Sequence, residues 1–465
     1  MSNVLMPTGT YECFWSLGDE PCTGQVVLEP GQGATGLVRN APGLWSEDDS
    51  YRWFDQHTTE HARLAGDLTV GQRVLLIDAL MAHNSPEVSD VFARLALVGS
   101  FPAGDDPLFD AVRFQVGGLS RLAGVPALDG VRFPREPERS FTATVHPNAA
   151  QVWKRPSGDR ISLEFEIAFQ TDMRFRAAVT SQPILEVTGA PRTAEQWVDD
   201  YVRPMAELAA FATGRRQDVE WVLLRPEMAG RAFTTQLFAS GISQVPYLAE
   251  APTDPRQPLL LRLGPDGADL GVLLERWQGL AEQHPVLHNH LVTVARQTPS
   301  RTARFMGVVP AIEAFHGEKH VKVPKAVFKQ RRREVLERLV GAGAGQADLA
   351  WLDDWLPAYG DRALHERLQQ LAEGLPEGVR TRIEAVTEPL PEALKGVQGT
   401  PLSVWHVMAK VRNNLAHGGE HPRTDQLELL CHLADTVAAA LVLQEIGASE
   451  DLLVRAIDDH SWDVV

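Results

Sequence analysis

Six consecutive residues near the end of the chain combine side chains that suit phosphate chemistry. The segment Arg412–His417 reads R-N-N-L-A-H and is followed directly by two glycines. An arginine holds a phosphate oxygen through a planar fork of donors at any pH, and a histidine titrates close to neutral pH. A histidine can therefore pass a proton to or from the attacking and leaving oxygens. Together these residue types indicate cleavage of a phosphodiester.

A helix is predicted to carry this segment. The residues before it are apolar at helical spacing, at Val404, Val407, Met408 and Val411. The two glycines are expected to end that helix. Residues five positions apart lie on different faces of an α-helix. We therefore expect His417 at or beyond the last regular turn, where a relaxed backbone can bring it back toward Arg412.

A simpler interpretation of the segment stays open on these residues alone. Arginine and histidine near the C-terminal end of a helix also donate to its free carbonyls and oppose the helix dipole. Arg412 and His417 would then stabilise a helix end and carry no chemistry. The neighbouring sequence has to separate the two interpretations.

The surroundings of the segment resemble a family of ribonucleases. An apolar helix with R-N-x-x-x-H, a glycine break and a long amphipathic C-terminal helix is similar to the R-x-x-x-x-H signature of HEPN ribonucleases, and specifically to the ApeA-like HEPN proteins of bacterial antiphage defence. The last helix is expected from Thr424 until Gly447. Its apolar residues recur at helical intervals, at Leu427, Leu430, Ala434, Val437, Leu441, Leu443 and Ile446.

The resemblance covers most of the chain, although only the motif is sharp. Arg304–Met306 leads into Ala311–Gly317, a stretch similar to the opening helix of the family's HEPN domain. Leu273–Trp277 resembles the helix before that domain. Gly24–Leu28 and Gly66–Leu76 are similar to its β-rich N-terminal domain.

The resemblance implies an endoribonuclease that needs no metal or cofactor. His417 would assist attack by the ribose 2′-hydroxyl, Arg412 would stabilise charge on the phosphorane, and Asn413 would orient one of these groups. One motif supplies one imidazole, and HEPN relatives pair two domains about a two-fold axis. A homodimer or higher even-numbered oligomer is therefore expected. The implied partners are an RNA substrate and a phage-derived trigger, in abortive infection.

An alternative from another class is a non-catalytic HEPN module that binds a nucleotide or a partner protein. The intact Arg412, Asn413 and His417 argue against it. Glu313 and His316 lie one turn apart on the helix expected to pack beside the motif. Either they are a solvated pair, or Glu313 helps to orient His417 or Arg412.

A basic strip follows that helix. The run from residue 319 to residue 333 has no acidic residue, and its cations are Lys319, Lys322, Lys325, Lys329, Arg331, Arg332 and Arg333. These charges form either a solvated helix start or an RNA-binding surface that guides phosphates. The net charge of −17 argues against a protein that coats nucleic acid non-specifically, so any RNA contact must be local.

Metal chemistry is the competing interpretation. His57, Glu60 and His61 spell H-x-x-E-H, a zinc metallopeptidase pattern that requires a helix. Thr58 and Thr59 are poor helix formers, and the following residues predict strands. A β-domain with ordinary histidines is therefore favoured, and no metal site is predicted.

A second group of histidines also predicts no metal site. Pro285 breaks the periodicity that would align His284, His288 and His290, so hydrogen bonds at helix ends and between helices are expected instead. The three cysteines are not in C-x-x-C spacing and predict no disulfide framework or zinc ribbon. Neither a phosphate-binding P-loop nor a dinucleotide fingerprint occurs.

The 465 residues, 44% of them apolar, are expected to fold as an α+β multidomain protein. Residues 1–190 predict a β-rich domain, with alternation at Ile161–Phe169. Residues 191–300 predict an α+β middle region, opened by a capping box at Thr193 and Gln196. Residues 301–465 predict an all-α HEPN bundle. With no signal peptide or apolar run of about 18 residues, a cytoplasmic protein without membrane contact is expected.

Overall fold

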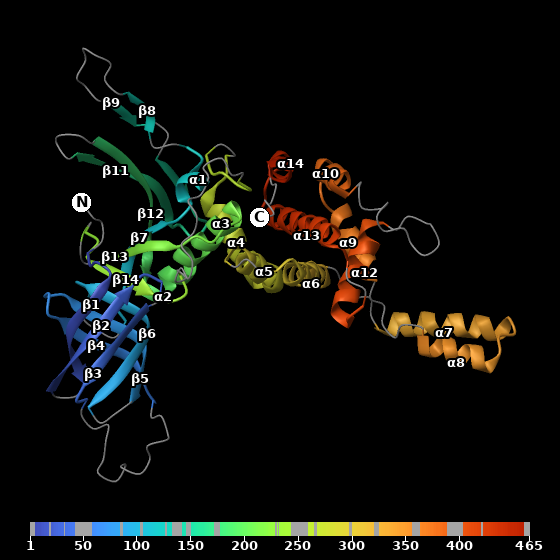
Figure 1. The fold of residues 1–465 in the computed structure, drawn as a ribbon, viewed down its shortest axis with the longest axis horizontal. Coiled ribbons are helices and arrows are strands. Elements are labelled where there is room, and N and C mark those ends of the chain that lie inside the picture. The colour runs from blue at the N-terminus through green and yellow to red at the C-terminus, as the bar shows by residue number, and fades with distance from the viewer. Residues whose placement is uncertain are drawn as a thin grey trace, which may run out of the picture. The chain divides into compact units, whose positions relative to one another are not determined.

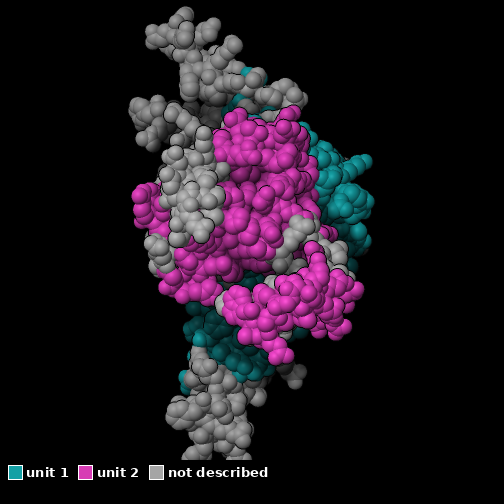
Figure 2. Space-filling view, turned by 90° about the vertical axis from the view of Figure 1, so that its right-hand side faces the viewer, with its two compact units in different colours: residues 1–278 teal, residues 279–465 magenta. Residues whose placement is uncertain are grey.

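The computed structural model has a β-rich N-terminal region and a helical C-terminal region (Figure 1). The chain separates into two compact units, residues 1–278 and 279–465, shown in teal and magenta in Figure 2. The structure describes residues 5–17, 20–31, 33–41, 58–83, 87–102, 106–125, 128–132, 142–145, 150–171, 177–227, 230, 232–242, 259–264, 267–296, 300–319, 325–355, 363–387, 403–419 and 422–459.

The first six strands close into a ring. Strand β5 pairs antiparallel with both β4 and β6, so the order β6-β3-β2-β1-β4-β5 returns to β6. The strands are β1 (Gly9–Leu17), β2 (Glu20–Glu29), β3 (Gly33–Arg39), β4 (Thr58–Leu68), β5 (Arg73–His83) and β6 (Val88–Gly99).

Alternate residues of this ring fill its interior, as the period of two in a strand requires. Trp15 is fully buried while its neighbour Phe14 is 46% exposed. The Trp15 indole Nε1 donates to the Leu37 carbonyl at 3.1 Å. A Cβ at Gly24 would stand 2.6 Å from that indole nitrogen, so glycine there lets the ring close over the tryptophan.

The sheet continues beyond the ring in the order β10-β11-β12-β7-β13-β14-β6. These strands are β7 (Phe109–Val116), β10 (Gln151–Lys154), β11 (Arg160–Thr171), β12 (Ala177–Arg192), β13 (Val219–Pro226) and β14 (Thr235–Ala239). The short helix α1 (Leu119–Ala123) and the two-stranded sheet of β8 (Leu128–Arg132) and β9 (Thr142–Val145) lie between β7 and β10 in the chain. The strand predicted at Ile161–Phe169 is confirmed as part of β11.

A helical segment interrupted by a π-turn joins β12 to β13. It consists of α2 (Ala194–Trp197), η2 (Val198–Val202) and α3 (Arg203–Thr213). The predicted capping box is confirmed, because Thr193 Oγ1 accepts from the Gln196 amide and the Thr193 amide donates to Gln196 Oε1. Gly214 ends α3 in the left-handed conformation at φ 65°.

The division of the chain differs from the predicted three regions. The expected boundary at residue 190 falls inside β12. Strands β13 and β14, expected in a separate middle region, pair with β7 and β6 of the same sheet. Pairing between distant strands leaves no trace in local periodicity, so the sequence pattern could not show that these segments share one sheet.

The second unit is helical. Helix α4 (Leu270–Gln283) crosses the division between the units. The helices that follow are α5 (Pro285–Arg296), α6 (Arg301–Lys319), α7 (Lys325–Gly341), α8 (Gln346–Trp355), α9 (Leu364–Glu373), α10 (Glu377–Thr387), α12 (Val404–His417), α13 (Thr424–Glu445) and α14 (Glu450–Asp459). Helix α6 packs against α5, α9, α12 and α13.

Helix α13 is the core of this unit and differs from the amphipathic helix expected. Every residue from Leu433 to Leu443 is buried, because α13 is apolar on all sides and is covered by neighbouring helices. Among the described helices, α13 is long enough and has a high enough mean hydropathy to span a membrane, but Glu428 and Asp435 interrupt its apolar residues and 78% of its most apolar window is buried, as in a core helix. Gly447 ends α13 as predicted, yet α13 is not the last helix, since α14 follows.

Candidate functional site

The motif lies at the C-terminal end of α12, and the predicted helix is confirmed. Ser403 caps its first turn by accepting from the His406 amide. His417 is its last residue, and Gly418 adopts the left-handed conformation at φ 70°. The Gly419 amide then donates to the Asn414 carbonyl at 2.7 Å. The two glycines therefore end the helix as expected.

Arg412 is held by two neighbours. Its Nη1 donates to Asn413 Oδ1 at 3.1 Å, and its Nη2 lies 3.7 Å from Glu313 Oε2 on α6. The side chain is 29% exposed. This arrangement fixes the direction of the guanidinium while part of it still meets solvent.

Glu313 joins two arginines from different helices. Besides its contact with Arg412 of α12, its Oε1 accepts from Arg367 Nη1 of α9 at 2.8 Å. Of the two interpretations of Glu313, the structure therefore places it against Arg412, and it is not a purely solvated residue. Arg367 was not singled out from the sequence, because nothing local distinguishes it from any other arginine on an amphipathic helix. Arg367 and Arg412, with Glu313 between them, form a cluster that we call the arginine pair.

His417 is exposed and is separate from Arg412. Within the described ranges it makes no hydrogen bond or ion pair. Because α12 stays regular through its last residue, the two side chains leave the helix about 140° apart around its axis. The expected swing of His417 back toward Arg412 is therefore not seen in the single chain.

The other histidines of the unit serve helix packing. His316 is buried, and its Nε2 lies 3.0 Å from Gln370 Oε1 of α9, so it is neither solvated nor in contact with the motif. His284 Nδ1 lies 2.8 Å from Glu318 Oε2. Burial, with Arg304 nearby, lowers the pKa of His290 to about 4. The His284 contact agrees with the expected hydrogen bonding between helices, whereas the buried Nε2 of His290 has no hydrogen-bond partner among the described residues.

A stacked histidine pair was missed by the sequence reasoning. The rings of His365 on α9 and His406 on α12 stack with centroids 3.6 Å apart. Burial and the nearby His365 lower the pKa of His406 despite the opposing Glu366. The pair lies in the first turns of the two helices, away from the end of α12 that carries Arg412. It is a packing contact between α9 and α12.

A buried ion pair fixes α6 on α13. Arg304 Nε lies 2.7 Å from Asp435 Oδ2, and the Asp435 side chain is only 4% exposed. Burial raises the pKa of Asp435 to about 7, although Arg304 opposes that shift. Because α6 also carries Glu313, this pair helps to set the position of the carboxylate that faces Arg412.

The basic strip divides into several parts. Lys319 forms an ion pair with Glu445. Lys322 lies outside the described residues, as does the side chain of Lys325. On α7, which packs along α8, the side chains of Lys329, Arg331 and Arg333 are exposed, and Arg332 is half-buried. Among the described residues of the strip, Lys329, Arg331 and Arg333 are therefore exposed cations that a phosphate backbone can reach.

If the protein cuts RNA, as the resemblance implies, reversing Lys329, Arg331 and Arg333 to glutamate is expected to weaken that cleavage and to flatten its dependence on salt. Each lost phosphate contact lowers the slope of log affinity against log salt by about one unit. The measurement is cleavage across a salt series, beside an Arg338→Glu control on the same helix outside the strip. An unchanged salt slope would make the strip an ordinary solvated surface.

The zinc-peptidase pattern does not have the geometry it needs. His57 lies outside the described residues, and Glu60 and His61 are adjacent on strand β4 instead of on a helix. Adjacent strand residues point to opposite faces. Over the part of the chain that the structure describes, no group of three or more histidine, cysteine or acidic side chains could hold a metal ion.

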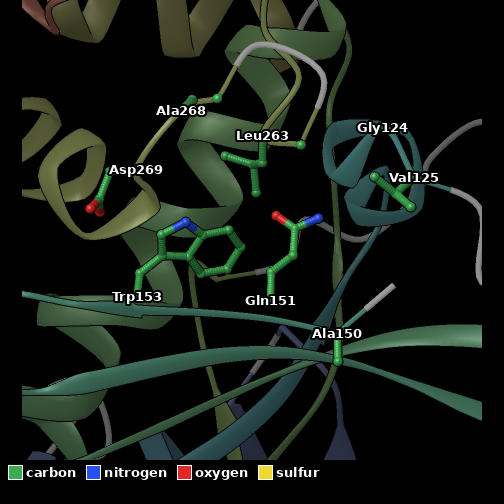
Figure 3. Close-up of a pocket in the computed structure, with 10 residues that line it drawn as sticks. Gly124, Val125, Ala150, Gln151, Trp153, Leu263, Ala268 and Asp269 are labelled. Atoms are coloured by element: carbon green, nitrogen blue, oxygen red, sulfur yellow. The ribbon is translucent and has the colours of Figure 1, made fainter. Parts of the chain in front are cut away.

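A hollow of about 620 Å³ lies in the first unit beside β10 (Figure 3). The Gln151 amide, the Trp153 indole and Leu263 line it. The Asp269 carboxylate at its edge caps α4 by accepting from the Gly271 amide at 2.8 Å. Asp269 is the only acidic or basic side chain among the described lining residues. The hollow therefore offers no acid–base pair, and the end of α12 with Arg412, Asn413 and His417 remains the candidate site.

Comparison with known proteins identifies the first unit. Residues 12–277 match the family described as ApeA N-terminal domain 1. No curated protein and no solved structure matches the chain. The match includes the ring of strands, the extended sheet and the start of α4, and it supports a role in antiphage defence. Because it spans more than half of the sequence, the chain belongs to the ApeA family by its N-terminal domain.

Proposed function

We propose that this protein is a cytoplasmic, metal-independent HEPN endoribonuclease that acts in antiphage defence by abortive infection. The observation that carries the proposal is the end of α12. There Arg412 is held by Asn413 and Glu313, and the exposed imidazole of His417 has no partner among the described residues. A fixed cation and an uncommitted titratable group are the two parts that transfer within a phosphodiester requires.

The proposed reaction uses only groups of the protein and the RNA. His417 accepts the proton of a ribose 2′-hydroxyl as its oxygen attacks the adjacent phosphorus. Arg412 donates to the phosphorane oxygens, where negative charge develops, and Asn413 keeps the guanidinium in place through its 3.1 Å hydrogen bond. The bond to the 5′-oxygen then breaks, and a second imidazole protonates that leaving oxygen.

The chemistry of the product ends tests this reaction. Attack by the 2′-hydroxyl leaves a 2′,3′-cyclic phosphate on one fragment and a 5′-hydroxyl on the other. We expect those ends when a defined oligoribonucleotide is cut, and no cleavage when the 2′-hydroxyl at the cut position is replaced by hydrogen. Products with a 3′-hydroxyl and a 5′-phosphate would contradict the proposal, because they require water to attack the phosphorus.

One observation favours a second candidate, a non-catalytic module that binds a nucleotide or a partner protein. In the single chain Arg412 and His417 point to different sides of α12 and do not contact each other. A second copy whose motif faces the first removes this difficulty, since each site then receives groups from two helices. The ribonuclease proposal therefore requires a homodimer or a larger even-numbered oligomer.

The surface at α12 bears on how such a dimer forms. Among the described residues of the second unit, the exposed large apolar side chains are Val286, Val340 and Trp351, and none of them lies on α12. Asn413, Ala416 and His417 are exposed there. A contact through the end of α12 would therefore be largely polar.

Mixing wild-type and His417→Ala subunits is expected to lower cleavage more than in proportion to the mutant fraction. If each site needs two imidazoles, an equal mixture with free exchange retains about one quarter of the activity, the fraction of wild-type dimers. Arg382→Ala subunits, changed at an exposed side chain of α10, serve as the control. Retention of about one half would mean that each site needs only one His417.

A further inference from the structure

We propose that Arg367 is a positioning residue that holds Glu313 away from Arg412, so that Arg412 keeps its donors for a substrate phosphate. The proposal rests on the proposed ribonuclease function for its purpose, but the geometry behind it does not. Glu313 of α6 has an arginine on each side, Arg367 from α9 and Arg412 from α12. The Glu313 carboxylate lies closer to the Arg367 guanidinium than to the Arg412 guanidinium.

Glu313 is hydrogen-bonded to one arginine and only close to the other. The 2.8 Å from Arg367 Nη1 to Glu313 Oε1 is typical of a charge-assisted hydrogen bond. The 3.7 Å from Arg412 Nη2 to Glu313 Oε2 is beyond hydrogen-bond range. Glu313 therefore attracts and orients the Arg412 guanidinium without occupying its donors.

The unoccupied N–H groups of Arg412 are important because phosphates and carboxylates compete for the same donors of a guanidinium. A carboxylate bound directly to a guanidinium takes up its paired N–H groups, which are also the groups that bind phosphate oxygens. Arg412 already gives one Nη1 hydrogen to Asn413. If Glu313 closed onto its Nη2, little of the fork would remain for a substrate.

Charge supports the same role. Two guanidinium groups and one carboxylate leave the arginine pair with one excess positive charge, which favours a phosphate. Without Arg367, Glu313 and Arg412 would neutralise each other. The three side chains are 23%, 24% and 29% exposed for Arg367, Glu313 and Arg412, so their mutual attraction is only partly screened by water.

Chemical labelling of Arg412 tests the proposal without relying on catalysis. Phenylglyoxal reacts with guanidinium groups, and mass spectrometry of the full-length protein's peptides gives the rate at each arginine. In Arg367→Ala we expect the labelling rate of Arg412 to fall by about 5-fold, because Glu313 closes onto it with a charged hydrogen bond. In Glu313→Gln and in the double variant the rate should equal or exceed that of wild type. Arg382, exposed on α10, is the internal reference.

A different pattern of Arg412 labelling is expected if the Arg367–Glu313 ion pair only joins α9 to α6. Arg367→Ala and Glu313→Gln break the same ion pair, so a structural role would move Arg412 labelling in the same direction in both. Arg367→Lys, which can still hold Glu313, should retain wild-type labelling. Unchanged or faster labelling in Arg367→Ala, or no recovery in the double variant, would overturn the proposal.

Cleavage assays on the same variants separate this inference from the proposed function. We expect RNA cleavage at low substrate concentration to fall by about 5-fold in Arg367→Ala and to recover in the double variant to the Glu313→Gln level. If wild type cuts no RNA while the labelling pattern holds, the ribonuclease proposal fails and the role of Arg367 stands. If wild type cuts RNA and labelling does not change among the variants, the role of Arg367 is wrong.

Discussion

Replacing either Arg412 or His417 with alanine is expected to abolish RNA cleavage and phage protection while the protein stays folded. Loss of a general acid–base group costs about 10²–10⁴-fold in rate, and loss of a donor to a developing anion costs about 10²–10³-fold. Neither side chain is in the core, since Arg412 is 29% exposed and His417 is exposed at the end of α12. Plaque counts, host growth and cleavage of total RNA measure the effect.

Two controls separate catalysis from support of the helix end. Arg382→Ala removes an exposed arginine from α10 and should leave all three readouts unchanged. His417→Gln keeps a polar side chain at the end of α12 but cannot carry a proton between oxygens at neutral pH, so it should be as inactive as His417→Ala. An active His417→Gln, or unfolding of both alanine variants, would favour the helix-capping interpretation of the motif.

Replacing Asp159 with alanine is expected to destabilise the protein by about 3 kcal/mol, because Arg192 loses the nearly buried one of its two carboxylate partners, and Tyr201 and Ser157 lose their acceptor. The Asp159 side chain is 3% exposed and lies 2.7 Å from Arg192 Nη2. Tyr201 also donates to it, as does Ser157 at 2.8 Å. These contacts tie β11 and β12 to the π-turn η2. The midpoint of urea unfolding, followed by tryptophan fluorescence of the full chain, measures the loss.

The pKa of Asp159 gives this prediction a pH signature. Burial alone would raise the pKa, but hydrogen bonds from Arg192, Tyr201 and Ser157 outweigh it and lower the pKa below its usual value. A carboxylate with a lowered folded-state pKa stabilises the protein above its unfolded pKa and loses that contribution as the pH falls through the folded value. The difference between wild type and Asp159→Ala should therefore be full at pH 7 and shrink in acid.

An exposed ion pair is the matched control for this substitution. Asp106, 61% exposed, pairs with Arg63 on the surface of the same unit. Asp106→Ala should change the free energy of unfolding by at most about 1 kcal/mol, because water screens exposed pairs. Equal effects of Asp159→Ala and Asp106→Ala would mean that the Asp159 cluster does not hold this part of the fold together.

Local features of the fold were predictable, and distant contacts were not. The end of α12 at Gly418, the Thr193 capping box and the β11 alternation follow from short-range chemistry, and the structure confirms all three. Closure of the β1–β6 ring depends on β5 pairing with β6, which no local pattern encodes. Periodicity likewise predicted the apolar positions of α13 but not its burial on every side, which depends on the helices packed around it.

The candidate site divides in the same way. Arg412, Asn413 and His417 could be chosen because their residue types and spacing suit one chemistry. Glu313 could be suggested as a neighbour, but its contact with Arg412 depends on how α6 packs against α12. Arg367 and the stacked His365 and His406 come together only in three dimensions. The expectation of a dimer comes from the resemblance to HEPN proteins, because the structure of a single chain contains no second copy.

The most direct measurement of the central claim is cleavage of RNA by the purified protein in excess EDTA, with wild type beside His417→Ala. The proposed reaction uses a protein imidazole and guanidinium, so wild type should cut RNA at the same rate with and without the chelator, and His417→Ala should cut none. Cleavage that EDTA abolishes, or cleavage that persists in His417→Ala, would contradict the assignment of Arg412 and His417 as the catalytic residues of a metal-independent ribonuclease.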